Sequence, residues 1–272
     1  MKLRALIDNN AVIDRYFLAE PAFCCLLEEG ETRILFDAGY SAAFLDNAAA
    51  MELDLSGIDA VVLSHGHDDH AGGLRHWMAR FPEGGRRPAL VAHPRAFDPK
   101  RVDGLSVGSP STLAELSARF EPRLSRGPLP IGERFVFLGE IPRSGGIEAK
   151  DPVGETDGPE GRVPDFLWDD SALVWKGEEG LVVIAGCSHA GIANIAEYAV
   201  RVCGDPRIQD IVGGFHLLNA SPERLAHTAG RLRDLAPRAV HPCHCTDLAA
   251  KIRLAADLPV ADYGVGMVLE YR

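Results

Sequence analysis

Short apolar runs recur along the 272 residues, and several of them are bounded by Gly, Asp or Ser. Uninterrupted runs of this length are typical of strands that are buried within a sandwich of sheets. The pattern therefore predicts strands at 3–7, 22–27, 33–36, 60–63, 89–92, 135–138, 172–175, 181–185, 211–212, 239–240 and 267–270.

Segments with a helical pattern lie between these runs, at 42–50, 74–81, 112–120, 192–202, 222–235 and 247–256. Ser221 before Pro222 fits a capped helix start with proline in the first position. Thr246 is expected to cap the last helix. The length fits one large domain or two small ones, and no linker rich in Gly, Pro or Ser divides the chain.

The least regular segment, 143–166, has the composition of a loop. A loop of this length inside a compact domain is more often functional or mobile than idle. Two interpretations are open: a flap or insertion near a site, and a disordered surface loop.

Composition and charge narrow the class of protein. With 46% hydrophobic and 25% charged residues, the chain is of the ordinary globular type, which excludes disordered, collagen-like and disulfide-scaffold classes. A formal charge of −11 argues against a broad contact with nucleic acid or an anionic membrane, although a small basic pocket remains compatible with it. No apolar signal region and no apolar run of ~18 residues is present. The six cysteines lack framework spacing, so we expect a cytoplasmic protein with reduced thiols, and nothing in the pattern selects an oligomeric state.

The chemistry is concentrated after the apolar run at 60–63, where His65, His67, Asp69 and His70 lie within six residues. Burying three imidazoles and a carboxylate together is costly unless something satisfies their lone pairs. A divalent cation does so, and this donor set suits Zn, Mn or Fe better than Ca. His65 and His67 are two apart on extended backbone and can face one side. One ion with four ligands would fit, but two adjacent ions, each completed from elsewhere in the chain, explain the cluster better.

Three later segments show a strand end followed by potential ligands. They contain Cys187 and His189, then His216, then His244. Strand ends are where a sheet protein gathers side chains from distant parts of the chain into one site. Cys187 could be a thiolate ligand, but we favour a buried structural thiol. For His216 a metal ligand, a substrate contact and a core histidine are all open.

On these residues the chain resembles the metallo-β-lactamase superfamily, and within it the branch of ribofuranosylaminobenzene 5′-phosphate synthase and dihydropterin-type synthase homologues. The matching pieces are LFDAG (35–39), LSHGHDDHAGGL (63–74), GEIPR (139–143), WDDSALVW (168–175), VVIAGCSHAGIANI (182–195), GGFHLL (213–218) and HCT (244–246). The resemblance implies an α/β fold, a four-layer αββα sandwich, as a single domain over 1–272 with the site at one edge and a flap or insertion around 143–166.

The resemblance also implies a ligand set. His65 and His67 correspond to the first-metal pair, Asp69 and His70 to the second-metal pair, and His189 and His244 to later ligands. Common members of the superfamily have a separate histidine and then a bridging Asp or Cys, whereas this strand runs into Cys-Ser-His without a carboxylate. His189 therefore either completes the first metal or occupies the bridging place.

Other polar residues receive weaker predictions. Asp37 is expected either to orient a ligand histidine or to end a strand in a turn. Arg143 is expected to clamp an anion of the substrate or to be a solvated surface residue. Asp169 and Asp170 are expected to support the ligands or the flap. We expect structural roles for His241, Cys243 and Cys245, and surface positions for His76, His93 and His227.

The resulting functional prediction is a metal-dependent hydrolase with one or two divalent ions, most simply zinc, with Mn or Fe as alternatives. A metal-activated water would attack an ester, lactone or phosphoester of a small, anionic or phosphorylated molecule, with Asp69 orienting it and His216 and Arg143 contacting substrate. The alternative that the resemblance supplies is a synthase-like transferase that uses a phosphoribosyl donor. A third alternative is metal-dependent ligand binding without catalysis.

Overall fold

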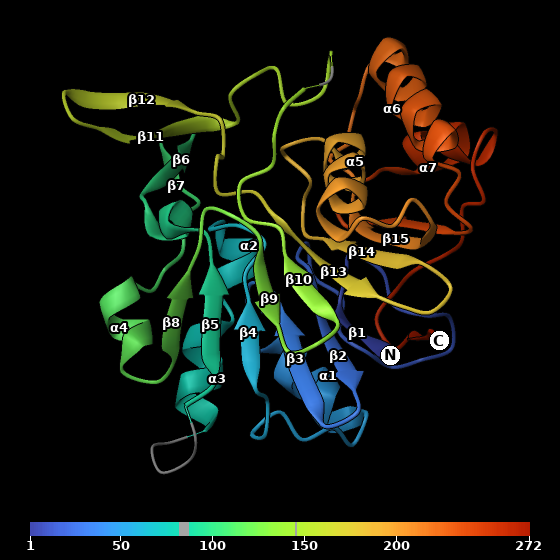
Figure 1. Ribbon diagram of the computed structural model, residues 1–272. Coiled ribbons are helices and arrows are strands. Elements are labelled where there is room, and N and C mark those ends of the chain that lie inside the picture. The colour runs from blue at the N-terminus through green and yellow to red at the C-terminus, as the bar shows by residue number, and fades with distance from the viewer. Residues whose placement is uncertain (82–86, 145) are drawn as a thin grey trace.

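Two β-sheets pack face to face in the centre of the molecule (Figure 1). The computed structural model describes residues 1–81, 87–144 and 146–272. In those ranges the first sheet has seven strands in the order β17 (Val268–Glu270), β1 (Lys2–Ile7), β2 (Cys24–Glu29), β3 (Thr32–Phe36), β4 (Ala60–Val62), β5 (Ala89–Ala92) and β8 (Glu121–Leu124). The second has six in the order β16 (Val240–Cys243), β15 (Ile208–Gly214), β14 (Leu181–Ala185), β13 (Ala172–Lys176), β10 (Phe135–Phe137) and β9 (Leu129–Ile131).

Side-chain alternation along the strands explains why the sheets stack. In β14 the side chains of Val182 and Ile184 belong to the apolar cluster between the two sheets, together with Phe36 and Trp175. Leu181, Val183 and Ala185 of the same strand face outward into a second apolar cluster. Because every residue of β14 is buried, its sequence is a continuous apolar run, as expected for a strand that is covered on both faces.

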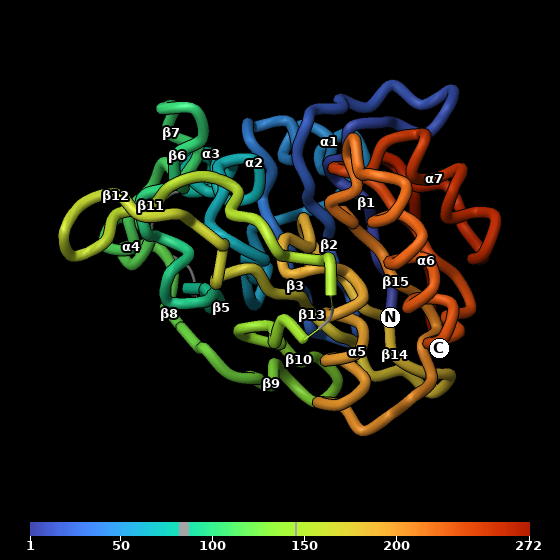
Figure 2. Tube along the Cα trace, turned by 90° about the horizontal axis from the view of Figure 1, so that it is seen from above, coloured from blue at the N-terminus to red at the C-terminus, as the bar shows by residue number. Residues whose placement is uncertain are grey.

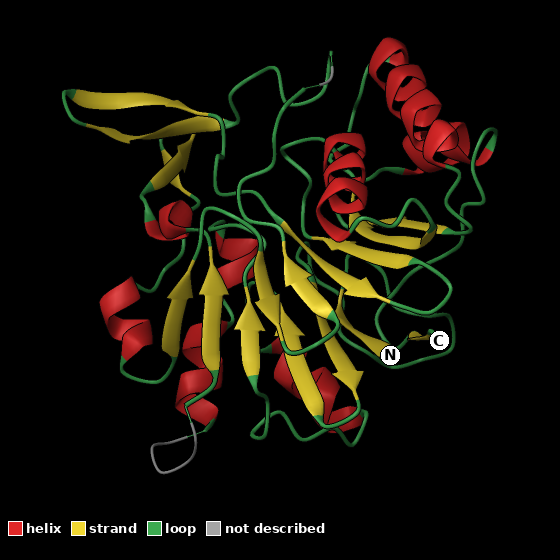
Figure 3. Ribbon diagram, viewed as in Figure 1, coloured by secondary structure: helices red, strands yellow, loops and turns green. Residues whose placement is uncertain are grey.

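Helices cover the outer face of each sheet (Figure 3). On the first sheet they are α1 (Ala43–Ala50), α3 (Leu74–Arg80) and α4 (Leu113–Ser117), which bury Phe44, Trp77 and Leu116 against it. On the second they are α5 (Ile192–Cys203), α6 (Pro222–Leu235) and α7 (Leu248–Ala255). The predicted α/β four-layer sandwich is confirmed. No helix in the described ranges is long and apolar enough to cross a membrane.

A small third sheet projects from the sandwich on the side away from α6 and α7 (Figure 2). It consists of β6 (Lys100–Val102), β7 (Leu105–Ser106), β11 (Gly154–Gly158) and β12 (Gly161–Asp165). Part of the predicted irregular segment 143–166 is thus a regular hairpin, which its polar composition concealed; Gly145 lies outside the described residues. This sheet adjoins the HxHxDH loop, because the Asp68 amide donates to Val107 and the Ser109 amide donates to Gly66.

The structure tests the two helix caps that the sequence predicts. Ser221 does cap α6, since its side chain accepts the Arg224 amide and Pro222 is the first helical residue. The Thr246 prediction is wrong, because Asp247 caps α7 by accepting the Ala250 amide at 2.8 Å. Thr246 instead accepts the Phe215 amide at 2.9 Å and so ties two strand ends together.

Candidate metal centre

The ends of the parallel strands β4, β14, β15 and β16 bring the chemistry-bearing residues to one edge of the sandwich. After β4 the chain passes His65, Gly66 and His67 and enters the short helix α2 (Asp68–Ala71). Glycine is required at position 66, since a Cβ there would lie 1.7 Å from the Ala96 carbonyl oxygen. The Gly66 amide donates to Asp169 at 2.8 Å, which fixes the loop between two ligand histidines.

The first donor group consists of His65, His67 and His189, whose ligand atoms all lie within 4.8 Å of one another. Both ring nitrogens of His189 and the Nε2 atom of His65 are buried without a hydrogen-bond partner in the described part of the chain. Burial lowers the pKa of all three imidazoles, in His67 to about 4, so they are neutral and keep a lone pair. Three neutral imidazoles, two of which have unpartnered buried nitrogens, fit a divalent ion.

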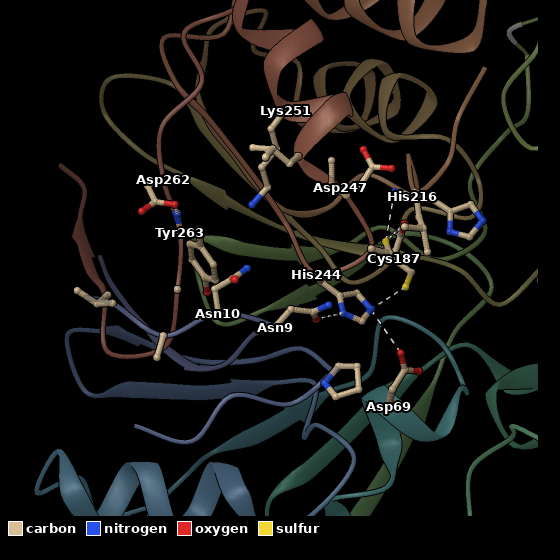
Figure 4. A pocket seen from close by; sticks show the side chains of 18 of the residues that line it. Asn9, Asn10, Asp69, Cys187, His216, His244, Asp247, Lys251, Asp262 and Tyr263 are labelled. Carbon is tan, nitrogen blue, oxygen red and sulfur yellow. Dashed lines mark hydrogen bonds and ion pairs between the residues drawn. The ribbon is translucent and has the colours of Figure 1, made fainter. Parts of the chain in front are cut away.

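The second donor group consists of Asp69, His70, Cys187 and His244. The Cys187 sulfur lies 3.3 Å from His70 Nε2. It also lies 3.1 Å from His244 Nε2, and Asp69 Oδ2 lies 3.4 Å from the same nitrogen (Figure 4). Four convergent N, O and S donors match the coordination number of zinc. Cys187 is buried, as expected of a structural thiol, but its sulfur also lies inside a set of potential ligands, so the role of a thiolate ligand stays a hypothesis. Together, the two groups account for all six predicted metal ligands.

Asp37 orients the ligands from behind. Its carboxylate lies 2.7 Å from His70 Nδ1 and accepts the Ser64 amide at 2.7 Å and the Ser64 hydroxyl at 2.8 Å. The ring of His70 therefore presents Nε2 to the second donor group. Although burial lowers the pKa of His70, the charges of Asp69 and Asp37 outweigh it and raise this pKa to about 9. The orienting role expected of Asp37 agrees with this contact.

Two N-terminal residues, which the sequence did not single out, hold His244. Its amide donates to Asp8 at 2.8 Å, and its Nδ1 atom lies 3.2 Å from Asn9 Oδ1. No local sequence pattern predicts these contacts, because the partners are more than 230 positions apart in the chain. Asp69 lies beside the ring of His244. Burial raises the pKa of this carboxyl group, but the imidazoles of His70 and His244 outweigh burial and hold the pKa well below its usual range.

His216 lies beside the first donor group, with its ring centroid 4.3 Å from that of His189. It also forms a set of ligand atoms with Cys187 and His189. The amide of His216 donates to the Cys245 sulfur at 3.2 Å, and its Nδ1 atom has no partner among the described residues. This position suits a substrate contact as well as a ligand.

Arg143 is used differently from the predicted anion clamp. Its Nη2 atom donates to the carbonyl oxygens of Phe166 and Leu167, and its guanidinium lies 4.4 Å from the ring centre of Trp168. The arginine therefore fixes the segment that leads to Asp169 and Asp170, and it does not line the cavity described below.

The predictions for the other polar residues are confirmed at some positions and wrong at others. His241 has a structural role beside Asp210, at 3.0 Å. His93 is not a surface residue: it is fully buried, and its Nδ1 atom accepts the Arg95 amide at 3.1 Å. Asp170 supports the loop of His189 by accepting the Ala190 amide at 2.8 Å, and burial raises its pKa to about 7.

A cavity of about 870 Å³ opens directly onto both donor groups. At one end it is lined by His67, Asp69, Cys187, His189, His216 and His244. It extends from there along the N-terminal loop and α7, so its volume far exceeds the needs of the ligands alone. Cavities of this size take whole small molecules.

Comparison with known proteins places this geometry in a family. Residues 19–188 match the model of the metallo-beta-lactamase superfamily. Protein MJ0448 of Methanocaldococcus jannaschii is 31% identical over 93% of each chain. The 7,8-dihydropterin-6-methyl-4-(beta-D-ribofuranosyl)-aminobenzene-5'-phosphate synthase of the same organism is 30% identical over 92% of this chain and 89% of its own length.

A solved structure extends the comparison to three dimensions. Tm1679, described as a metal-dependent hydrolase of the beta-lactamase superfamily, superposes with a TM-score of 0.85 at 30% identity, over 99% of this chain and 98% of its own. The match spans both sheets and all strand ends that carry the donor groups. This chain therefore belongs to the metallo-beta-lactamase superfamily.

Proposed function

We propose that the protein is a metal-dependent hydrolase of small molecules that contain an ester, lactone or phosphoester bond. His65, His67 and His189 would hold one divalent ion, and Asp69, His70, Cys187 and His244 a second. The thiol among the donors favours zinc or iron over manganese. When bound, such ions lower the pKa of a coordinated water to about 7 and polarise the oxygen of the bond to be cleaved.

The side chains of the protein supply the remaining requirements. Asp69 lines the cavity beside His67, and its ionised carboxylate can accept a proton of an attacking water and hold that water in place. Asp37 holds the proton on Nδ1 of His70, so Nε2 is the ring nitrogen that would give up its proton and bind a metal ion. His216 lines the cavity beside His189, so its ring is placed to contact the substrate.

The observation that carries the proposal is the juxtaposition of two complete donor groups at the floor of one open cavity. A structural metal site is closed, whereas a catalytic site leaves room for water and substrate. A metal-dependent binding protein without turnover would share the ligands but would give no product in any substrate screen.

Metal analysis of purified protein tests the first half of the proposal. We expect one to two equivalents of zinc or iron per chain, and His67→Ala is expected to lose most of the metal while His76→Ala, outside both donor groups, keeps it. Hydrolysis of phosphodiesters, lactones or thioesters should disappear on chelation and return with metal. Wild-type protein that folds, holds metal and turns over none of these bonds would refute the hydrolase.

A second function is favoured by one observation, the 30% identity with the methanogen synthase over almost the whole chain. In that case the cavity would take a phosphoribosyl donor, and pyrophosphate would leave. Incubation with phosphoribosyl pyrophosphate and aminobenzoate-type acceptors separates the two functions. Metal-dependent release of pyrophosphate with a new product supports the transferase, and its absence beside ester or lactone hydrolysis supports the hydrolase.

A further inference from the structure

A lysine side chain lies at the end of the cavity that is away from the donor groups. Lys251 extends from α7 into the cavity on the side of Asp262 and Tyr263, whereas His216, Cys187 and Asp69 occupy the other side (Figure 4). Among the described residues that line this cavity, Lys251 is the one lysine or arginine.

The ammonium group of Lys251 makes no direct contact with a carboxylate of the described residues, although Asp247 and Asp262 line the same cavity. Its ammonium group has no hydrogen bond or ion pair within the described part of the chain. The nearest acidic residue on its helix, Asp247, uses one oxygen for the Ala250 amide and the other for the Asn219 amide, both at 2.8 Å. Asp262 accepts the Tyr263 amide. No described contact of the fold uses the ammonium group, so it is available to an anionic group of a ligand.

Part of the cavity wall is apolar. Leu248 lies three residues before Lys251 on α7, so both face the same side of the helix. Leu248 is 72% exposed and Leu218 is 62% exposed, and together with Ile13 they border the cavity. Large exposed apolar side chains that surround a cavity are typical of a ligand-binding groove.

We propose that Lys251 forms an anion subsite, which selects substrates with a phosphate or carboxylate at the end remote from the cleaved bond and an apolar or ring segment between them. This inference rests on the proposed function, because the donor groups define the end where the bond is cleaved. The volume of about 870 Å³ accommodates such a molecule in one piece. The segment 248–255 thus supplies a specificity determinant that the HxHxDH loop does not.

Bifunctional probes test the subsite independently of turnover. Each probe carries a hydroxamate, a group that chelates divalent metals, and an alkyl chain that ends in a phosphonate, a carboxylate or an uncharged carboxamide. Affinities are measured by calorimetry on the metal-containing protein for wild type, Lys251→Met and Lys251→Arg. Lys176→Met removes an exposed lysine that does not line the cavity and is the matched control.

In wild type the anionic probes should bind about 10- to 100-fold more tightly than the carboxamide, at the best chain length. Lys251→Met should abolish this preference without changing the affinity of the carboxamide probe, while Lys251→Arg and Lys176→Met retain it. A larger preference for phosphonate than for carboxylate would identify a phosphorylated substrate, and the reverse a carboxylate.

Equal binding of charged and uncharged probes by wild type, or a preference that survives in Lys251→Met, overturns the subsite and leaves the metal centre intact. Metal-containing wild type that binds no hydroxamate at all overturns the accessible metal centre and both proposals with it. Unfolding temperatures of the variants show whether any loss of binding reflects a loss of folded protein.

Discussion

Lys100 is the buried cation that joins the small third sheet to the ligand loop, and we expect its removal to lower the stability of the fold strongly. Its Nζ atom lies 2.8 Å from Asp169 Oδ1 and 3.5 Å from Asp165 Oδ2. The side chains of Lys100 and Asp169 are 3% and 1% exposed. Because Asp169 also accepts the Gly66 amide, the ion pair connects β6 to the HxHxDH loop.

Lys100→Met keeps most of the side-chain volume but leaves two buried carboxylates without their cation. Removal of one partner of a buried ion pair costs about 3–5 kcal/mol. At about 2–4 °C per kcal/mol for a domain near this size, the unfolding temperature should fall by roughly 6–20 °C. Urea unfolding followed by circular dichroism measures the free energy, provided that the slope with urea is unchanged.

The adjacent residue on β6 provides the control. Arg101 pairs with Asp157 at 2.7 Å, but these side chains are 25% and 51% exposed. Water screens such a pair, so Arg101→Met should cost about 1 kcal/mol or less. Adding Asp169→Asn to Lys100→Met should recover part of the loss, since it removes one uncompensated charge while keeping an acceptor for the loop. If Lys100→Met costs no more than Arg101→Met, the buried pair does not connect sheet and loop as reasoned.

Three further predictions concern the site and its supports. Asp37→Asn should weaken metal binding about 10- to 100-fold in a chelator competition, because it removes the carboxylate that orients a ligand imidazole; unchanged affinity would contradict that role. Gly66→Ala should prevent folding or metal uptake, since its Cβ would overlap the Ala96 carbonyl, and a stable, metal-loaded variant would show that this loop can shift. Burial raises the pKa of Asp170 from 3.8 to about 7, so between these pH values the folded protein keeps a proton that the unfolded chain releases. The free energy of unfolding should therefore fall as the pH rises from about 4 to 7, by about 4 kcal/mol at most. Asp170→Asn should flatten the stability profile over that range, and a profile that keeps its slope would assign it to other groups.

The central strands could be predicted from the sequence because both of their faces are buried. Runs such as 89–92 and 181–185 are apolar throughout, and the structure places β5 and β14 over the same residues. The strands that were missed lie at edges or in the small third sheet. β12 is exposed at four of its five positions, and β8 at three of four, so their sequences carry no apolar pattern.

The ligand loop could also be predicted, since its donors are crowded into six consecutive positions. The place of Cys187 in the second donor group could not, because it depends on contacts between distant segments. Cys187 reads as an ordinary buried thiol until β14 and β16 are paired through β15, which brings its sulfur to His244. Lys251 likewise has no motif, and only the shape of the cavity distinguishes it from a surface lysine.

A shared backbone feature explains why periodicity fails at the strand ends. An extended chain places residues two apart on the same face, yet Cys187 lies in the second donor group and His189 in the first, although the two also form a set of ligand atoms with His216. Ser188 between them has φ of 59°, which turns the chain so that Cys187 also reaches His70 and His244 while His189 also reaches His65 and His67. The same left-handed conformation recurs where β3, β15 and β16 end, at Asp37, His216 and His244.

Each of these positions is held by a specific contact. A non-glycine residue in this conformation costs on the order of 1–2 kcal/mol and persists only where its surroundings impose it. The Ser188 hydroxyl donates to Gly214, the His216 amide donates to the Cys245 sulfur, the His244 amide donates to Asp8, and Asp37 accepts the Ser64 amide. The fold thus uses backbone strain at four strand ends to aim its functional side chains. These turns depend on contacts between residues that are far apart in the sequence, so no local pattern of residues could have predicted them.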